Sequence, residues 1–342
     1  MTLLQEIKIN KLFSFWLVAS LMLVFLIIII GGLTRLTNSG LSIIEWELFK
    51  GVLPPMNTES WYIYFEKYKS IPQYKLLNFN MTIDEFKIIF YWEYIHRLLA
   101  RFIGLFFLLP LIFFYFSRKI NKKYLKICFL IFSLIIFQGL IGWYMVKSGL
   151  VNNITVSHYR LALHLSLAII IISTIFWLLK NINEKKEIIF FNFAKNNLPY
   201  HFLLIIIFLQ IIVGAFVSGL DAGMIYQTWP LMNQGYFPDD TIFVNYNNYI
   251  NFNNRSLVQF YHRNLAYFII FYAIILALYI YLNKAKNLYK PFIYLFSVLI
   301  FQIFLGIFTL LSGLNIYLAS AHQISSVLLI FSALNLYFFK VK

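Results

Sequence analysis

Residues 137–150 read FQGLIGWYMVKSGL, and residues 301–314 read FQIFLGIFTLLSGL. The two stretches share Phe, Gln, Gly, Ser, Gly and Leu at the same positions without a gap. Two further pairs of segments follow the same order along the chain: EYIHR (93–97) with QFYHR (259–263), and GGLTRLTNSGL (31–41) with GAFVSGLDAGM (214–224). This internal repeat predicts two halves of similar design, residues 1–180 and residues 198–342.

The composition places the chain in a membrane. Of its 342 residues, 61% are hydrophobic and only 12% are charged, whereas soluble domains have about a quarter charged residues. A spanning helix needs roughly 20 mostly apolar residues. Eight runs qualify: 13–35, 88–116, 124–146, 158–179, 201–220, 257–282, 291–312 and 316–339. The sequence therefore predicts an all-α integral membrane protein, with eight transmembrane helices in two pseudo-symmetric four-helix bundles.

Lysine and arginine predict the orientation of these helices. One side of the membrane would hold sixteen of these residues and the other side eight. The positive-inside rule then places both termini in the cytoplasm, and the long loops 37–87 and 221–256 outside. The net charge of +15 comes from short clusters between apolar runs, which does not indicate nucleic-acid binding. The first apolar run predicts a retained helix rather than a cleaved signal peptide or a transit peptide.

Four of the six histidines obey the repeat. His96 and His262 begin the second span of their halves, and His164 and His322 begin the fourth. A lone histidine in a membrane helix usually makes a hydrogen bond between helices. Two imidazoles that face each other across a four-helix bundle suit the axial positions of a haem iron, whereas zinc usually takes three or four protein ligands. The pattern therefore favours one haem in each half.

Glu93 is the one acid, of thirteen, that falls within a predicted span. A charge at the bilayer centre costs about 2.5–3.5 kcal/mol, so a buried carboxylate indicates a function. Glu93 precedes His96 by three residues and shares its helix face. Its counterpart in the repeat is Gln259, which cannot ionise. This difference predicts chemistry in the N-terminal half that needs a proton acceptor or a charge stabiliser.

Arg97 and Arg263 directly follow the histidines that begin the second spans. They could extend to lipid headgroups or bind haem propionates, whose carboxylates suit the guanidinium fork. Their recurrence in the repeat favours the propionates. A propionate-binding role for Arg101 has less support, because its counterpart in the repeat is Tyr267.

Three other residues have no partner in the repeat. His158 and His201 lie at span edges, where we expect structural roles. Cys128 is the only cysteine, which excludes an intramolecular disulfide and a multi-cysteine metal site.

The outer loop 37–87 contains TESWYIYFEKY (58–68), in which aromatic residues recur at helical spacing. The pattern predicts an amphipathic helix at the membrane interface that covers a haem edge. An aromatic belt at the interface would give the same composition.

The chain resembles the haem A synthase family over essentially its whole length. The resemblance rests on GGLTRLTNSGLSI after the first span, EYIHR, HLSLA around His164, QFYHR, and AHQ at His322. It is closest to the cysteine-free branch found in proteobacteria and mitochondria, since loop 37–87 lacks the cysteine pair of the other branch.

The resemblance implies an oxidoreductase that converts the methyl group of haem O to the formyl group of haem A, for terminal oxidase assembly. It assigns His96 and His164 to the substrate haem, Glu93 to catalysis, and His262 and His322 to a low-spin haem b cofactor. The implied route is two successive hydroxylations, and it leaves open whether the oxygen comes from water or from dioxygen.

The resemblance also implies a setting and partners. The setting is the bacterial inner membrane, with the haem sites toward the periplasm and membrane lipid around the chain. The partners are a haem O synthase and an electron acceptor, and the resemblance leaves a homo-oligomer open.

Two other functions fit part of the pattern. A di-haem b electron carrier without chemistry of its own would explain the histidines and arginines, but not the difference between Glu93 and Gln259. A haem transporter would not need fixed pairs of histidines. A haem O synthase is disfavoured, because the sequence has no aspartate-rich motif for a prenyl diphosphate.

Overall fold

The computed structural model describes residues 3–46, 50–150, 154–240 and 249–342. These residues fold mainly into helices, with one isolated β-bridge between Met232 and Gly235 and no longer strand among them. Eight of the described helices are long and apolar enough to cross a membrane. They are α1 (Leu3–Leu36), α4 (Ile83–Ser117), α5 (Lys122–Gly149), α6 (His158–Asn183), α7 (Leu198–Gly219), α9 (Arg255–Leu282), α10 (Tyr289–Leu311) and α11 (Ile316–Val341). The prediction of an all-α chain with eight spans is confirmed.

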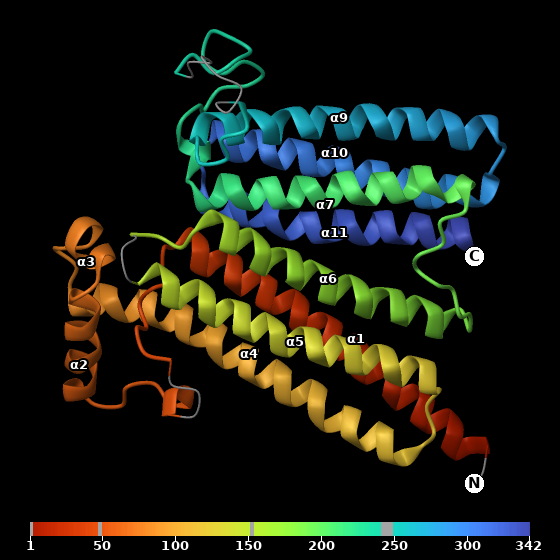
Figure 1. Ribbon diagram of the computed structural model, residues 1–342, viewed down its shortest axis with the longest axis horizontal. Helices are drawn as coiled ribbons and strands as arrows, with labels where there is room; N and C mark the ends of the chain where they lie inside the picture. Colours follow the sequence, from red (N-terminus) through yellow and green to blue (C-terminus); the bar gives the residue numbers. More distant parts are fainter. Residues whose placement is uncertain (1–2, 47–49, 151–153, 241–248) are drawn as a thin grey trace. The chain divides into compact units, whose positions relative to one another are not determined.

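The chain divides into two compact units, Met1–Leu179 and Lys180–Lys342. In the first unit, α1, α4, α5 and the larger part of α6 run alongside one another (Figure 1). In the second unit, α7 contacts α9, α9 contacts α10, α10 contacts α11, and α11 contacts α7, so the four helices close into a ring.

Helix α4 is long enough to extend beyond a bilayer. Its 35 residues correspond to a length of about 50 Å, against a hydrocarbon thickness of about 30 Å. A capping box fixes its start: the Glu85 backbone N–H donates to Thr82 Oγ1 at 3.3 Å, and the Thr82 backbone N–H donates to Glu85 Oε2 at 2.8 Å. The first turns of α4 are therefore free to pack against the outer loop.

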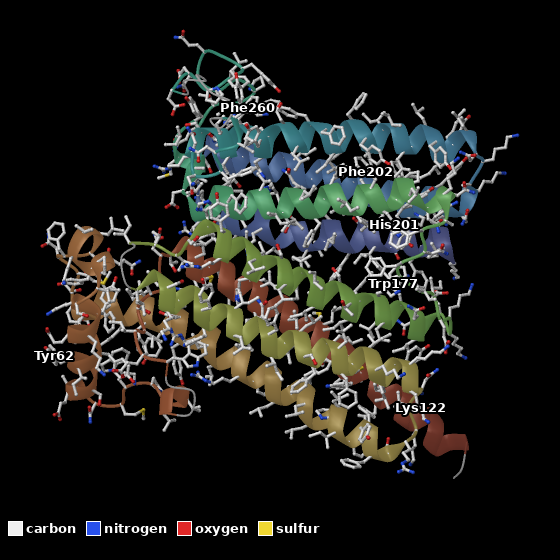
Figure 2. All side chains as sticks on the ribbon, in the orientation of Figure 1. Tyr62, Lys122, Trp177, His201, Phe202 and Phe260 are labelled. Atoms are coloured by element: carbon white, nitrogen blue, oxygen red, sulfur yellow. The ribbon has the colours of Figure 1, made fainter. Side chains whose placement is uncertain are left out.

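Two short helices of that loop, α2 (Thr58–Lys69) and α3 (Pro72–Leu77), lie at the end of the first unit opposite the α4–α5 turn (Figure 1). The predicted helix in 58–68 is confirmed. Its aromatic face is buried within the protein, because Trp61, Phe65 and Tyr68 pack in one cluster with Phe86 and Phe90 of α4. The position of the helix at the membrane interface stays a prediction. Tyr62, on another face of α2, stays half exposed (Figure 2). Burial of three large aromatic side chains stabilises the packing of α2 on α4.

The same aromatic cluster includes Leu41 and Ile43, from the segment that follows α1. The outer helices thereby hold this segment against α4. Whether they also cover a bound haem stays a prediction.

Candidate functional site

Each of the four histidines in the repeat lies against a glycine of a neighbouring helix. A Cβ atom added to the glycine would lie about 3 Å from Cε1 of the imidazole, closer than nearly all real Cβ contacts. The pairs are Gly31 with His96 at 2.9 Å, Gly142 with His164 at 3.0 Å, Gly214 with His262 at 3.1 Å, and Gly306 with His322 at 2.9 Å. The glycines provide the space that the rings occupy, and so define where each ring lies.

In the second unit, the rings of His262 and His322 face each other across the bundle. Their centroids are 6.3 Å apart, and their planes are inclined by 84°. Two imidazole nitrogens that each lie about 2 Å from one metal ion place the ring centres on the order of 6 Å apart. The spacing therefore fits a single iron between the two rings, as in a bis-histidine haem.

The tautomer of His322 suits that role. Its Nδ1 lies 3.1 Å from the backbone carbonyl oxygen of Gln302, to which it can donate its proton. The other ring nitrogen, Nε2, is then unprotonated and can act as a metal ligand. The side chain of Gln302 is held in turn, since Ser325 Oγ donates to its Oε1.

In the first unit, His96 of α4 lies beside Gly31 of α1, and His164 of α6 lies beside Gly142 of α5. Within the described residues, Nδ1 of each ring is buried and has no hydrogen-bond partner. Buried polar atoms without a partner often mark a site for a missing group. Each ring could therefore supply a nitrogen ligand to a bound group, and the pairing of the two rings around one iron stays a prediction.

Glu93 forms the centre of a buried polar cluster in the N-terminal third of α4. Its Oε2 accepts hydrogen bonds from Ser42 Oγ at 2.7 Å and from the Ile43 backbone N–H at 2.8 Å. Its Oε1 pairs with Nη2 of Arg97 at 2.6 Å. Among the described residues, Glu93 is the only buried carboxylate. These three contacts offset the cost of burying the charge, because the carboxylate is ion-paired and each of its oxygens accepts a hydrogen bond.

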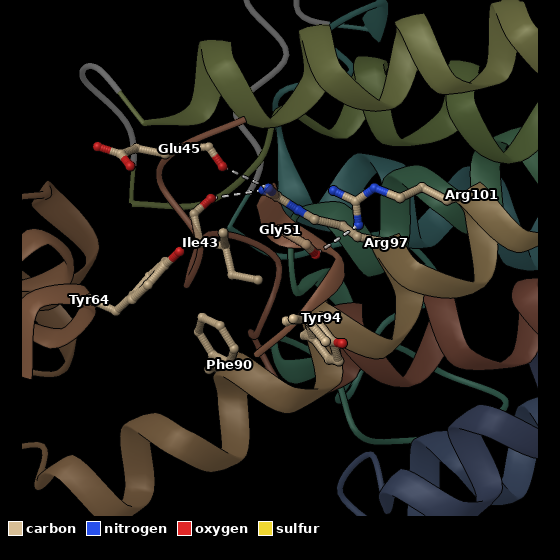
Figure 3. Close-up of a pocket in the computed structure, with 9 residues that line it drawn as sticks. Ile43, Glu45, Gly51, Tyr64, Phe90, Tyr94, Arg97 and Arg101 are labelled. Carbon is tan, nitrogen blue, oxygen red and sulfur yellow. Dashed lines mark hydrogen bonds between the residues drawn. The ribbon is translucent and has the colours of Figure 1, made fainter. Parts of the chain in front are cut away.

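Arg97 joins this cluster to the segment after α1 (Figure 3). Its Nη2 donates to the Ile43 carbonyl at 2.8 Å, and its Nη1 donates to the Glu45 carbonyl at 3.1 Å. The guanidinium also lies over the ring of Trp46, 5.2 Å from the centroid. Glu93 and Arg97, for which the sequence predicts separate roles, thus form one ion pair.

Arg101 lies one turn further along α4 and donates to the Gly51 carbonyl at 3.3 Å (Figure 3). Its guanidinium therefore bonds to a more distant part of the same outer loop.

In the second unit, an arginine and a glutamine bond to the neighbouring loop as Arg97 and Glu93 do in the first unit, but no carboxylate of the described residues takes part. Arg263 Nη2 donates to the Tyr226 carbonyl at 3.0 Å, as Arg97 does to Ile43. Gln259 Nε2 donates to the same Tyr226 carbonyl at 2.8 Å. An amide can thus replace the carboxylate as a link to the loop, so the link by itself does not require the charge of Glu93.

The hydroxyl of Tyr226 is held by the same loop. Burial, and hydrogen bonds to Asp239 and Asp240, raise the pKa of the Tyr226 hydroxyl above its usual range.

A pocket of about 240 Å³ lies beside the cluster in the first unit. Its lining combines two cations with aliphatic and indole side chains: Ile44, Trp46, Arg97, Trp143, Val146, Lys147 and Leu150. Lys147 Nζ lies over the Trp143 ring, 4.9 Å from its centroid. Such a pocket suits a ligand that carries both apolar surface and negative charge.

Comparison with known proteins extends this geometry to a family. Residues 14–334 match the COX15-CtaA family, described as cytochrome oxidase assembly protein. A heme A synthase of Pelagibacter ubique is 50% identical over 328 residues, which cover 94% of both chains. The heme A synthase of Rickettsia bellii is 42% identical over 92% of this chain and 94% of its own. That of Wolbachia pipientis is 42% identical over 94% and 90%. The chain belongs to the COX15-CtaA family.

In this COX15-CtaA protein, the two remaining histidines lie in different surroundings. His201 packs in an aromatic cluster, 4.5 Å from Tyr337 and 5.5 Å from Phe193 between ring centroids. The ring centroid of His158 lies 4.0 Å from that of Tyr159, and the two planes are inclined by 39°. The described glycine–imidazole contacts involve the four repeat histidines. Among the described residues, no three His, Cys, Asp or Glu side chains gather into a metal site.

Sequence reasoning missed the glycines that face the histidines and the polar contacts of Ser42. The glycines carried a signal, since Gly31, Gly142, Gly214 and Gly306 all lie within the repeated segments. The pairing of Glu93 with Arg97 also has a sequence signal, because residues four apart on a helix are neighbours. The contact of Ser42 with Glu93 has no sequence signal, because the two residues are 51 positions apart.

Proposed function

We propose that this membrane protein is a haem A synthase, which oxidises one methyl group of haem O to the formyl group of haem A. The observation that carries the proposal is the 50% identity to a heme A synthase over 94% of both chains. The paired histidines support it, because they supply ligands for two haems. The chain is therefore expected to be an oxidoreductase of haem biosynthesis.

The two units would hold different haems. His262 and His322 would ligate haem b, which supplies one-electron transfer when it is bound. His96 and His164 would ligate haem O, the substrate. The assignment follows from the position of Glu93, the buried carboxylate, in the first unit.

Glu93 would act on the methyl group during two successive hydroxylations, after which the gem-diol loses water to give the aldehyde. With water as the oxygen source, each hydroxylation releases two electrons and two protons, so a membrane electron acceptor is required. The negative charge of Glu93 would stabilise positive charge that develops at the methyl carbon, or accept its proton. A carrier of electrons alone would not need this charge, since Gln259 makes the corresponding link in the second unit.

The cation-lined pocket supports a position for the substrate carboxylates. Arg97 and Lys147 lie on its wall, and two cations suit the two propionates of a haem. Arg263 would meet a propionate of haem b in the second unit, where its Nε is buried and lacks a hydrogen-bond partner among the described residues.

The haem content of membranes tests the proposed function. Cells that make haem O but not haem A should accumulate haem A when this chain is expressed, and extracted haems separated by chromatography would show it. A profile that contains only haem O and haem b, with the protein present and loaded with haem, would indicate an electron carrier.

The glycines give a prediction about haem b. Gly306→Ala places a methyl group 2.9 Å from Cε1 of His322, and the ring must then move from its position. Changes of this kind next to a metal ligand typically lower affinity by about 10- to 100-fold. The haem b content of the purified protein, measured as the pyridine haemochrome, should fall accordingly. Gly104→Ala is the matched control, because nothing lies within 4 Å of its added Cβ. Equal haem b in the two variants would contradict the prediction.

The excess of lysine and arginine supports cytoplasmic termini and haem sites toward the periplasm. Haem O synthase would then deliver the substrate within the inner membrane. A green fluorescent protein fused after Lys342 should fluoresce in a bacterial host, because it folds in the cytoplasm. A non-fluorescent fusion that is present in the membrane at normal amounts would reverse the orientation.

A further inference from the structure

Three of the four repeat histidines share a second support besides the glycine. A glutamine side chain on the neighbouring helix donates a hydrogen bond from Nε2 to the backbone carbonyl of the histidine residue. The three bonds are Gln138 to His164 at 3.0 Å, Gln210 to His262 at 3.0 Å, and Gln302 to His322 at 2.9 Å. Each glutamine precedes by four residues the glycine that the imidazole faces. The glutamine holds the helix turn, and the glycine makes room for the ring.

His96 is the exception. The glycine that faces it is Gly31, and the residue four positions earlier is Ile27. An isoleucine side chain has no donor for the His96 carbonyl. The added Cβ at Gly31 lies 2.9 Å from Cε1 of His96, and that at Gly214 lies 3.1 Å from Cε1 of His262. The pair α1 and α4 therefore approaches as closely as the pair α7 and α9. The His96 carbonyl lacks a glutamine donor because position 27 is an isoleucine, and not because the helices are further apart.

The turn that carries His96 is held mainly from outside the bundle. Glu93 bonds to Ser42 and to the Ile43 backbone, both in the segment that follows α1. Helix α1 contributes only a long contact to this turn: Thr34 Oγ1 lies 3.3 Å from the Trp92 carbonyl oxygen. The same hydroxyl makes a shorter hydrogen bond, of 2.8 Å, to the Ile30 carbonyl within α1. The support of His96 thus depends on a connecting segment rather than on a spanning helix.

We propose that His96 is the ligand that releases the substrate haem first, and that His164 holds the haem until it leaves. The bond from His96 to the iron would break first as the substrate or product passes, and the bond from His164 would break after it. Each electron pair would remain on its imidazole nitrogen, so no oxidant or reductant is needed. A site that turns over must exchange its haem, whereas a site that holds a resident cofactor gains from two fixed ligands. This inference rests on the proposed function, which assigns the exchanging haem to the first unit. Gln138, Gln210 and Gln302 are then positioning residues for the three fixed ligands.

Exchanging the residue types tests the inference. Ile27→Gln supplies the missing donor to the His96 carbonyl, and Gln210→Ile removes the corresponding donor from His262. A net hydrogen bond changes such equilibria by about two- to tenfold. We expect haem to leave the first unit of Ile27→Gln more slowly, and haem b to leave Gln210→Ile more quickly, each by about that factor. Ile29→Gln is the matched control, since it adds an amide to α1 about 200° around the helix from position 27.

The measurement is the transfer of haem from the purified, haem-loaded protein to excess apomyoglobin, followed by visible absorption. The kinetic phase of haem transfer that disappears in His164→Ala reports haem leaving the first unit. Unchanged release from the first unit in Ile27→Gln, or an equal slowing in Ile29→Gln, would overturn the inference. An unchanged rate for haem b in Gln210→Ile would overturn it as well, even if Ile27→Gln does not assemble. If His164→Ala removes no phase, the first unit holds no haem, and the proposed assignment of the haems fails together with the inference.

Discussion

His262→Ala is expected to leave the protein folded and without stable haem b, and to abolish haem A formation with it. The ring centroids of His262 and His322 are 6.3 Å apart across the second unit, so removing one ring leaves an iron with a single protein ligand. His322→Ala should have the same effect. In both variants the pyridine haemochrome of the purified protein should lose the haem b component.

Two sets of variants sharpen this test. His201→Ala is the matched control in the same unit, because His201 packs in an aromatic cluster 4.5 Å from Tyr337; haem b should stay. His96→Ala and His164→Ala should spare haem b and change the retention of the substrate haem. Loss of haem b from these two variants, with retention in His262→Ala, would reverse the assignment of the two units.

Glu93→Gln is expected to bind haem b normally, to retain bound haem O, and to form little or no haem A, with the hydroxylated intermediate accumulating. The substitution keeps the shape of the side chain and removes its charge, as in the second unit at Gln259. Loss of a comparable electrostatic contact in a transition state costs about 10²–10³ in rate. The ratio of haem O to haem A in membranes, extracted at fixed times, measures the effect.

The structure adds a second consequence of Glu93→Gln. The carboxylate accepts from Ser42, from the Ile43 backbone N–H and from Arg97, and an amide cannot accept on both of its terminal atoms. The segment after α1 should therefore loosen as well. Ser42→Ala separates the two effects, because it removes one hydrogen bond from this segment and leaves the charge. We expect Ser42→Ala to lose about tenfold or less in rate. Equal losses in the two variants would make Glu93 a positioning residue, and a wild-type rate in Glu93→Gln would exclude any role in the chemistry.

The elements that depend on local composition could be predicted from the sequence. Runs of about 20 apolar residues predicted the eight spans, because the bilayer requires that length. The helix at 58–68 followed from the spacing of its aromatic residues. The order of the repeated segments predicted which histidines belong together, and the centroid distance of His262 and His322 agrees with that pairing.

The direction in which side chains point could not be predicted in the same way. The aromatic face of α2 packs on Phe86 and Phe90 of α4, and a lipid interface would favour the same residues. Hydropathy distinguishes apolar from polar surroundings, and it does not distinguish lipid from another helix.

By itself, the sequence determined that this chain has eight apolar helices, a repeat that relates its halves, and four histidines and one membrane carboxylate in that repeat. The tertiary structure decided what surrounds them: a glycine against each imidazole, a glutamine on three histidine carbonyls, and Ser42 on Glu93. The physical reason is distance along the chain. Spans and repeats depend on neighbouring residues or on pattern, whereas Ser42 and Glu93 meet across 51 positions, and only the packing of helices brings such residues together.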